Sequence, residues 1–247
     1  MLALVKWLKE IIMSAFKLIE QKIQSLASGT IVTLDELSDI GTRSAVATAL
    51  ARLSKEKFII RIRRGMYMKP KESRFGLMPP SREAIIAAIT QQGRKSYTAG
   101  LSAYNKLGLT TQVPNTFILR GGVTNSLIRI GGTKIEIKSG RSPKSKKDIP
   151  LMMILDSLRE IKIIPDSTLD EAVQILKSKI FELDKIQKIR LVDLAIKDKP
   201  VVRAILGAIL DEKNPEITNR LFVSLNPLTS YKIGASKLEF SKKWKIK

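Results

Sequence analysis

Residues 30–70 read TIVTLDELSDIGTRSAVATALARLSKEKFIIRIRRGMYMKP and contain the signals from which the N-terminal fold can be predicted. We expect an extended piece, two helices separated by a tight turn at Gly41, and two short strands around a turn at Gly65. An amphipathic pattern over 14–27 predicts a further helix before them. Together these elements follow the order of a winged helix-turn-helix.

Two threonines mark the expected helix starts. Thr33 has Glu36 three residues later, which is the spacing of a capping box, and it predicts a helix over 34–40. Thr42 is the expected N-cap of a longer helix over 43–57.

The longer helix has two different faces. Val46, Leu50 and Leu53 fall within an arc of about 60°, which predicts a buried stripe. The opposite face is small, polar and basic, and could approach DNA closely; it comprises Ser44, Thr48, Ala51 and Lys55. Arg43 lies at the edge of the stripe, in a first turn whose free N–H groups suit a phosphate.

The strand pair is the second expected DNA contact. Arg61, Arg63 and Arg64 lie on or beside its tip, and Gly65 permits the tight turn. Arginines at such a tip suit phosphate contacts or insertion into the minor groove. The alternative is a solvated basic hairpin on an ordinary small domain.

Composition limits the possible functions. The 247 residues include 44 Lys and Arg against 23 Asp and Glu, a net charge of +21, with neither Cys nor His. Cysteine and histidine nucleophiles, zinc fingers and His-ligated metals are therefore excluded. We predict a binding protein rather than an enzyme, without catalytic residues, metal or cofactor. Nuclease chemistry through carboxylates is the less favoured alternative, because the sequence has no clustered acidic motif.

The chain is expected to be an α+β protein with two domains. The N-terminal helix and the winged helix occupy 1–75, and a linker rich in proline and charge follows. The second domain, 80–247, comprises a basic α/β part over 80–150 and a mainly helical part over 151–247. In the α/β part we expect helices over 81–91 and 98–107, the latter closed by Gly108, and strands within 116–122 and 126–138.

The loop after the expected strands is strongly basic. We predict a possible second nucleic-acid contact there, from Arg141, Lys144, Lys146 and Lys147. Solvated charge that keeps the protein soluble explains it equally well. Asp156 and Glu160 share a helix face and could hold Mg²⁺, but such pairs are routine on helices.

No apolar run reaches the roughly 18–20 residues that a membrane span requires. The apolar N-terminus is interrupted by Lys6, Lys9 and Glu10, so we expect no export signal, no membrane partner and a cytoplasmic protein.

Two segments resemble a known family, the AbiE-type abortive-infection antitoxins. Residues 29–70 resemble its N-terminal winged helix. The segment YTAGLSAYNKLGLTTQVPNTFILRGG resembles the start of its second domain, through Ser102, Ala103, Gly108, Leu109, Thr111, Gln112, Val113 and Pro114. The likeness is good over roughly 14–145 and weak in the helical region.

The resemblance implies the antitoxin of a bacterial type IV toxin–antitoxin system. Such a protein binds inverted repeats in its own operator and represses its operon. It also neutralises a co-encoded nucleotidyltransferase-like toxin, without a need for direct contact. By motif match, the implied DNA-binding residues are Thr42, Arg43, Ser44, Thr48, Arg63, Arg64 and Gly65. The alternative is a winged-helix transcriptional regulator with a sensing C-terminal domain and no toxin.

Overall fold

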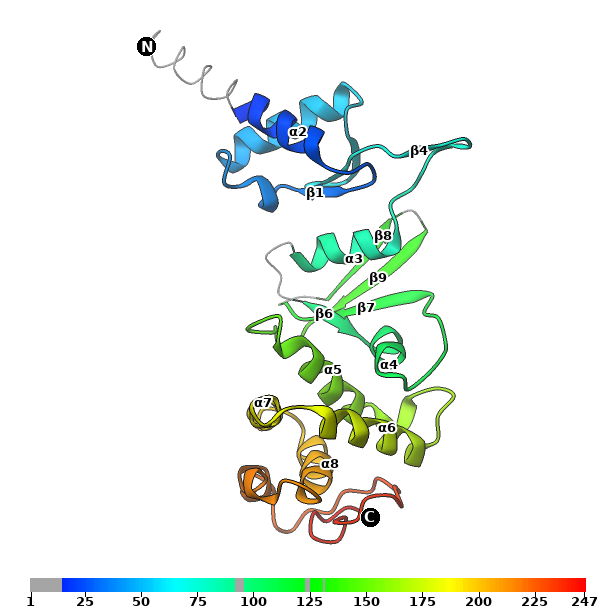
Figure 1. Cartoon of the computed structure of the whole chain (residues 1–247), viewed down its shortest axis with the longest axis vertical. Coiled ribbons are helices and arrows are strands. Elements are labelled where there is room, and N and C mark those ends of the chain that lie inside the picture. Colours follow the sequence, from blue (N-terminus) through cyan, green and yellow to red (C-terminus); the bar gives the residue numbers. More distant parts are fainter. Residues whose placement is uncertain (1–14, 92–95, 123–124, 131) are drawn as a thin grey trace. The chain divides into compact units, whose positions relative to one another are not determined.

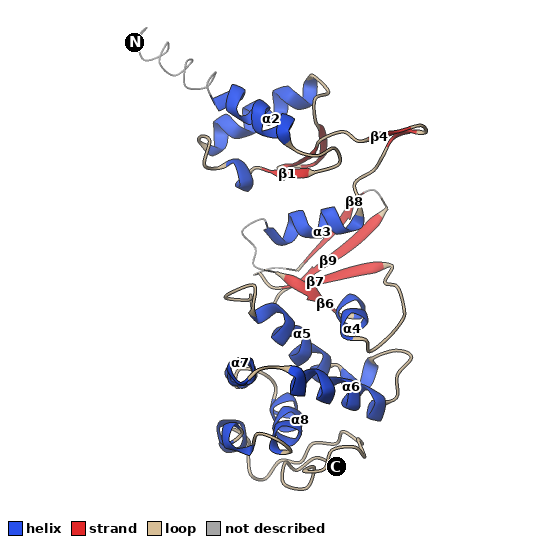
Figure 2. Cartoon of the chain, viewed as in Figure 1, coloured by secondary structure: helices blue, strands red, loops and turns tan. Residues whose placement is uncertain are grey.

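The computed structural model describes residues 15–91, 96–122, 125–130 and 132–247 (Figure 1). Contacts divide the chain into two compact units. Unit 1 covers the chain up to residue 95 together with 128–134, and unit 2 covers 96–127 and 135–247. Both helices and strands contribute, so the expected α+β class is confirmed (Figure 2).

Unit 1 begins with a helix over residues 15–25. The elements that follow are β1 (Ile31–Thr33), the 3-10 turn η1 (Asp35–Leu37), α2 (Arg43–Lys55), β2 (Ile60–Arg63) and β3 (Met66–Met68). The strands form an antiparallel sheet in the order β1-β3-β2, with Val32 opposite Tyr67. The elements over 15–69 follow the predicted order, except that a 3-10 turn replaces the helix expected over 34–40.

The predicted polarity of α2 is confirmed. Its buried residues are Val46, Ala49, Leu50 and Leu53, which pack with Ile19, Ile23 and Leu37 in one core. Thr42 has extended backbone angles, and its Oγ1 accepts a hydrogen bond from the Ala45 N–H at 3.3 Å. The helix therefore begins where the threonine cap predicts.

The expected helix over 34–40 is wrong in extent, because the structure has only the 3-10 turn η1 there. Half of the predicted capping box is present: the Glu36 carboxylate accepts from the Thr33 N–H at 3.0 Å. The Thr33 hydroxyl is buried and has no partner among the described residues. Thr33 belongs to β1, where it pairs with Met66, and this extended pairing takes its hydroxyl away from a helix cap.

The segment expected to be a plain linker contains a small hairpin. β4 (Glu72–Ser73) pairs with β5 (Gly76–Leu77), and all four residues are exposed. α3 (Arg82–Gln91) follows, close to its expected bounds, and packs against β1. The division by contacts keeps α3 in unit 1, whereas the sequence led us to place the boundary near 76–79.

A four-stranded sheet has the order β6-β7-β9-β8. Its strands are β6 (Tyr97–Ala99), β7 (Thr116–Arg120), β8 (Ser126–Ile130) and β9 (Thr133–Lys138), and α4 (Leu101–Leu107) lies between β6 and β7 in the chain. The predicted helix over 98–107 is therefore wrong at its start. Gly100, at φ +59°, separates the strand from the helix, and a Cβ there would lie 2.9 Å from Ile118. As predicted, Gly108 closes α4.

From Asp148 to Val223 the rest of unit 2 is mainly helical, as predicted for 151–247, whereas the tail over 224–247 contains no helix. It contains α5 (Asp148–Arg159), η2 (Ile161–Ile163), α6 (Leu169–Glu182), α7 (Lys185–Ala195), α8 (Pro200–Asp211), η3 (Pro215–Ile217) and α9 (Asn219–Val223). Pro200 and Pro215 begin their elements, which suits a residue without an N–H. The C-terminal tail adds Trp244 to the core, where its indole N–H donates to Asp211 at 2.7 Å.

No helix within the described residues is both long and apolar enough to cross a bilayer. The N-terminal residues Lys6, Lys9 and Glu10, and Gly131 within the expected strand segment 126–138, lie outside the described residues.

Candidate nucleic-acid interface

A groove of about 1000 Å³ lies between the start of α2 and the β2–β3 hairpin. It brings together six of the predicted DNA-binding residues: Arg43, Ser44, Arg61, Arg63, Arg64 and Gly65. Leu34, Asp35, Ala47, Ala51 and Tyr67 complete the lining. Two segments about fifteen to twenty residues apart in sequence thus form one concave surface.

Strand alternation and a glycine position the hairpin arginines. In β2 the isoleucines are half-buried and Arg61 and Arg63 are exposed, so the two arginines share a face. Gly65, at φ +76°, forms the tip. The Gly65 carbonyl accepts a hydrogen bond from the Leu34 N–H at 3.2 Å, which ties the hairpin to the segment preceding α2.

The groove carries positive charge that the protein does not neutralise. Arg43 donates to Asp35 at 3.0 Å, but the arginine side chain is 80% exposed and the aspartate 45%, so the pair is weak. Within the described part of the chain, Arg61, Arg63 and Arg64 have no ion-pair partner. Three exposed guanidinium groups are therefore available to an anion.

The first turn of α2 adds backbone donors. Thr42 satisfies the Ala45 N–H, while the N–H groups of Arg43 and Ser44 have no acceptor among the described residues. Such free amides at a helix start attract phosphate oxygens. The α2 start and the hairpin thus present donors of the same kind to one groove.

Three predicted contact residues lie outside the groove lining. Thr42, Thr48 and Lys55 are all exposed, and Thr42 serves as the helix cap. Sequence reasoning missed Leu34, Asp35, Ala47 and Tyr67, which do line it. Asp35 offers a signal in hindsight, because an acidic residue in a short turn before a helix can pair with a basic residue in that helix's first turn.

The comparisons with known proteins give a family but no function. One family matches over residues 18–192, and it is described as a family of unknown function, DUF6088. The chain belongs to DUF6088. Among solved structures it is similar to the RV2827C protein from Mycobacterium tuberculosis, at 11% identity and a TM-score of 0.48, covering 88% of this chain and 85% of that chain. No curated protein matches.

In this DUF6088 chain, the segment that carries the antitoxin resemblance is tied to the body of unit 2. Gln112 donates to Asp166 at 2.9 Å, and its backbone N–H donates to Thr110 at 3.2 Å. Ser102 and Ala103 lie in α4, and Val113 is exposed. These contacts give Gln112 a structural role, and Val113 remains on the surface.

The basic loop of unit 2 divides into two kinds of residue. The Arg141 guanidinium is half-buried and donates to Asp198 at 2.7 Å and to the Leu194 carbonyl. Lys144, Lys146 and Lys147 are exposed around the start of α5. Arg141 therefore belongs to an internal ion pair, while the three lysines are exposed to solvent.

Asp156 and Glu160 belong to an internal network of charges. Arg120 bridges them, at 3.3 Å to Asp156 and 2.9 Å to Glu160. Tyr97 also donates to Asp156 at 2.8 Å, and Tyr104 donates to Glu160. Both acids are thus held by protein donors, and no group of three or more Asp and Glu within the described residues could hold a metal.

Burial and hydrogen bonding act in opposite directions on the pKa values of the two acids in this network. Desolvation raises the pKa of Asp156 despite the nearby Arg120 and Arg159. Desolvation acts in the same direction on Glu160, but the Tyr104 and Arg120 hydrogen bonds outweigh it and lower its pKa. The pKa of Tyr97 is raised by burial and by the Asp156 charge, so its hydroxyl stays protonated and serves as a donor.

Proposed function

We propose that this protein binds double-stranded DNA through a winged helix-turn-helix in unit 1. The supporting observation is the groove that joins the α2 start to the β2–β3 hairpin, with Arg61, Arg63 and Arg64 exposed and unpaired. In this proposal α2 is the recognition helix and the hairpin is the wing. The wing arginines contact phosphates or the minor groove, and Ser44 and Thr48 read base edges.

We further propose that the DNA is the protein's own operator, with inverted repeats, and that the protein is the autorepressing antitoxin of an AbiE-type system. Its functional partner is then a co-encoded nucleotidyltransferase-like toxin. The resemblance of residues 29–70 and 97–122 to those antitoxins supports this role. A binding function in the cytoplasm, without catalysis, follows from the same proposal.

DNA binding is tested by fluorescence anisotropy with the protein's own upstream DNA and scrambled DNA of equal length, over a range of salt concentrations. Each phosphate contact contributes about 0.9 to the slope of log affinity against log salt. Arg63→Ala with Arg64→Ala should therefore reduce that slope by about 1.8. The matched control is Arg74→Ala with Arg82→Ala, which removes two exposed arginines of unit 1 that do not line the groove.

The outcomes separate specific from general binding. The proposal is supported if the protein prefers the upstream DNA even at higher salt, and if the slope of log affinity against log salt falls only in the hairpin variant. Equal binding to both DNAs, collapsing with salt and equally affected in the control, contradicts it. Substitution of Ser44 or Thr48 should change the preferred sequence rather than the slope.

The antitoxin role needs a separate test. Co-expression with the product of an adjacent nucleotidyltransferase-like gene should restore growth that the toxin alone arrests. Operator binding without such a gene, or without rescue, would instead favour a regulator whose C-terminal unit senses another signal.

A further inference from the structure

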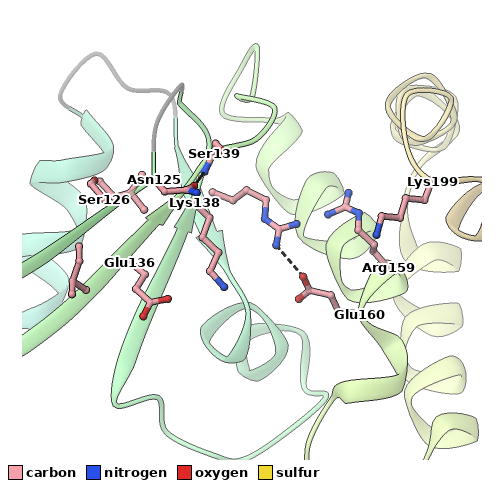
Figure 3. A pocket seen from close by; sticks show the side chains of 11 residues that line it. Asn125, Ser126, Glu136, Lys138, Ser139, Arg159, Glu160 and Lys199 are labelled. Carbon is pink, nitrogen blue, oxygen red and sulfur yellow. Dashed lines mark hydrogen bonds and ion pairs between the residues drawn. The ribbon is translucent and has the colours of Figure 1, made fainter.

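A second groove lies wholly within unit 2. Its volume is about 850 Å³, within the range of small-molecule sites (Figure 3). β7 and β9 contribute Arg120 and Lys138, the end of α5 contributes Arg159 and Glu160, and Lys199 precedes α8. The remaining lining residues are Asn125, Ser126, Leu127, Glu136, Ile137 and Ser139.

Cationic side chains outnumber acidic ones in this lining by four to two. Arg120 and Arg159 are paired with Asp156, Glu160 and Asp198, so Lys138 and Lys199 are the cations that an entering anion meets. Within the described residues, the ammonium groups of Lys138 and Lys199 have no ion-pair or hydrogen-bond partner, and both lysines are exposed. Figure 3 shows Lys138 on the strand side and Lys199 beside Arg159 on the helix side.

The two guanidinium groups are held in place. The Arg159 Nε donates to Asp198 at 3.0 Å, and Arg159 also contacts Asp156; both aspartates have side chains only 2% exposed. Arg120 is fixed by its bonds to Asp156 and Glu160. Such preorganised cations lose little conformational freedom when a ligand binds.

Other lining groups suit the remainder of a nucleotide. The start of α8, with Pro200 as its first residue, places the positive end of a helix at Lys199. The Asn125 Oδ1 accepts from the Ser139 N–H at 2.7 Å, which orients its amide N–H₂ as a remaining donor. Leu127, which is 45% exposed, supplies apolar surface against which a base or sugar can pack.

We propose that this groove binds a nucleotide through its phosphate, either as a free nucleoside triphosphate or as the 5′-phosphorylated end of RNA. Lys138 and Lys199 contact the phosphate oxygens, and the ion-paired Arg120 and Arg159 form a rigid wall behind them. This activity is separate from operator binding, because every lining residue belongs to unit 2.

The test uses the full-length protein and measures affinity by anisotropy for three probes: a fluorescent ATP analogue, a 5′-phosphorylated RNA octamer and the same octamer with a 5′-hydroxyl. The groove variant is Lys138→Ala with Lys199→Ala. Its control is Lys185→Ala with Lys242→Ala, which removes the same charge from exposed positions of unit 2 outside the groove. Urea denaturation checks that both variants fold like wild type.

We expect the groove variant to lose at least about tenfold in affinity for a phosphate-bearing probe, because hydrogen bonds to charged groups are among the stronger ones. Loss for the ATP analogue identifies a free nucleotide, and loss for the phosphorylated octamer alone identifies a chain end. Lys138→Arg with Lys199→Arg should retain binding. Arg63→Ala with Arg64→Ala should also retain it, whether or not the operator proposal holds.

Two results would overturn the proposal. One is equal affinity of the groove variant and the control for all three probes, which would mean that the net charge alone attracts phosphates. The other is equal binding of the two octamers together with no binding of the ATP analogue, which would mean that the groove does not select a phosphate end.

Discussion

Replacing Arg159 by methionine is the perturbation whose cost the structure defines best. The change keeps an unbranched apolar stem and removes the guanidinium group with its charge. Arg159 contacts Asp156 and Asp198, two aspartates whose side chains are almost completely buried. The variant leaves Asp156 with Arg120 and Tyr97, and leaves Asp198 with the half-buried Arg141.

The expected cost is large because burial leaves the acids little water to replace the arginine. Removal of one partner from a buried ion pair costs about 3–5 kcal/mol. Because both aspartates keep other partners, we expect Arg159→Met to lower the free energy of unfolding by about 3 kcal/mol, near the lower limit of this range. The matched control is Arg220→Met, whose pair with Asp193 is exposed, at 63% and 36%, and costs about 1 kcal/mol or less.

The free energy of unfolding is measured by urea denaturation followed by tryptophan fluorescence. The sequence has two tryptophans, so a Trp7→Phe background leaves Trp244 as the reporter. Trp244 is fully buried in the core of unit 2, the same unit as Arg159. Its signal therefore follows the part of the chain that the substitution perturbs.

The reasoning is refuted if Arg159→Met and Arg220→Met have the same unfolding free energy. A double-mutant cycle with Asp198→Asn adds a second check. If Arg159 and Asp198 interact as the structure shows, the double variant loses less than the sum of the two single variants. Strict additivity would mean that the ion pair contributes nothing to stability.

Three further substitutions have definite expected outcomes. Gly207→Ala should lower the free energy of unfolding, measured by urea denaturation, by roughly 1–3 kcal/mol, because the added Cβ would lie 2.2 Å from the Trp244 ring. Thr42→Ala should lower the free energy of unfolding by about 1 kcal/mol, because it removes the N-cap of α2 in unit 1. Urea denaturation monitored by circular dichroism measures this change. The hydrogen bond from Arg190 lowers the pKa of Asp148 below its ordinary 3.8. The ionised Asp148 therefore stabilises the fold at pH values above 3.8, and this stabilisation is lost as the pH falls through the lower pKa of the folded state. Asp148→Asn should therefore lower the urea midpoint at about pH 7 and reduce its loss between about pH 4 and pH 2.

The sequence predicted unit 1 well because its signals are local. A threonine cap, a helical stripe of apolar residues and a glycine turn each act within a few residues, as Thr42 and Gly65 show. The errors arose where a distant partner outweighed a local signal. Thr33 pairs with Met66 across the sheet, and Thr98 pairs with Leu119, so neither segment follows its local helical pattern.

The same contrast holds for the sites. The unit 1 groove could be predicted in large part, since exposure of the hairpin arginines follows from strand alternation. The unit 2 groove could not, because its cations come from β7, β9, α5 and the segment before α8. Neither Lys138 nor Lys199 is distinguished in the sequence from other lysines, and only the fold brings them to one surface.

Net charge alone is therefore a poor guide to where the proposed nucleic-acid contact lies. The segment 80–150 has the greatest excess of basic residues, yet two of its arginines, Arg120 and Arg141, are neutralised by acids that follow in the chain. The exposed hairpin of unit 1 has a smaller excess but keeps its arginines unpaired. If DNA affinity depended on the number of basic residues, segment 80–150 would contribute most of it. If it depends on unpaired charge held in the unit 1 groove, the β2–β3 hairpin contributes most. Comparing the salt slopes of the Arg63→Ala, Arg64→Ala variant and the Arg74→Ala, Arg82→Ala control distinguishes the two cases.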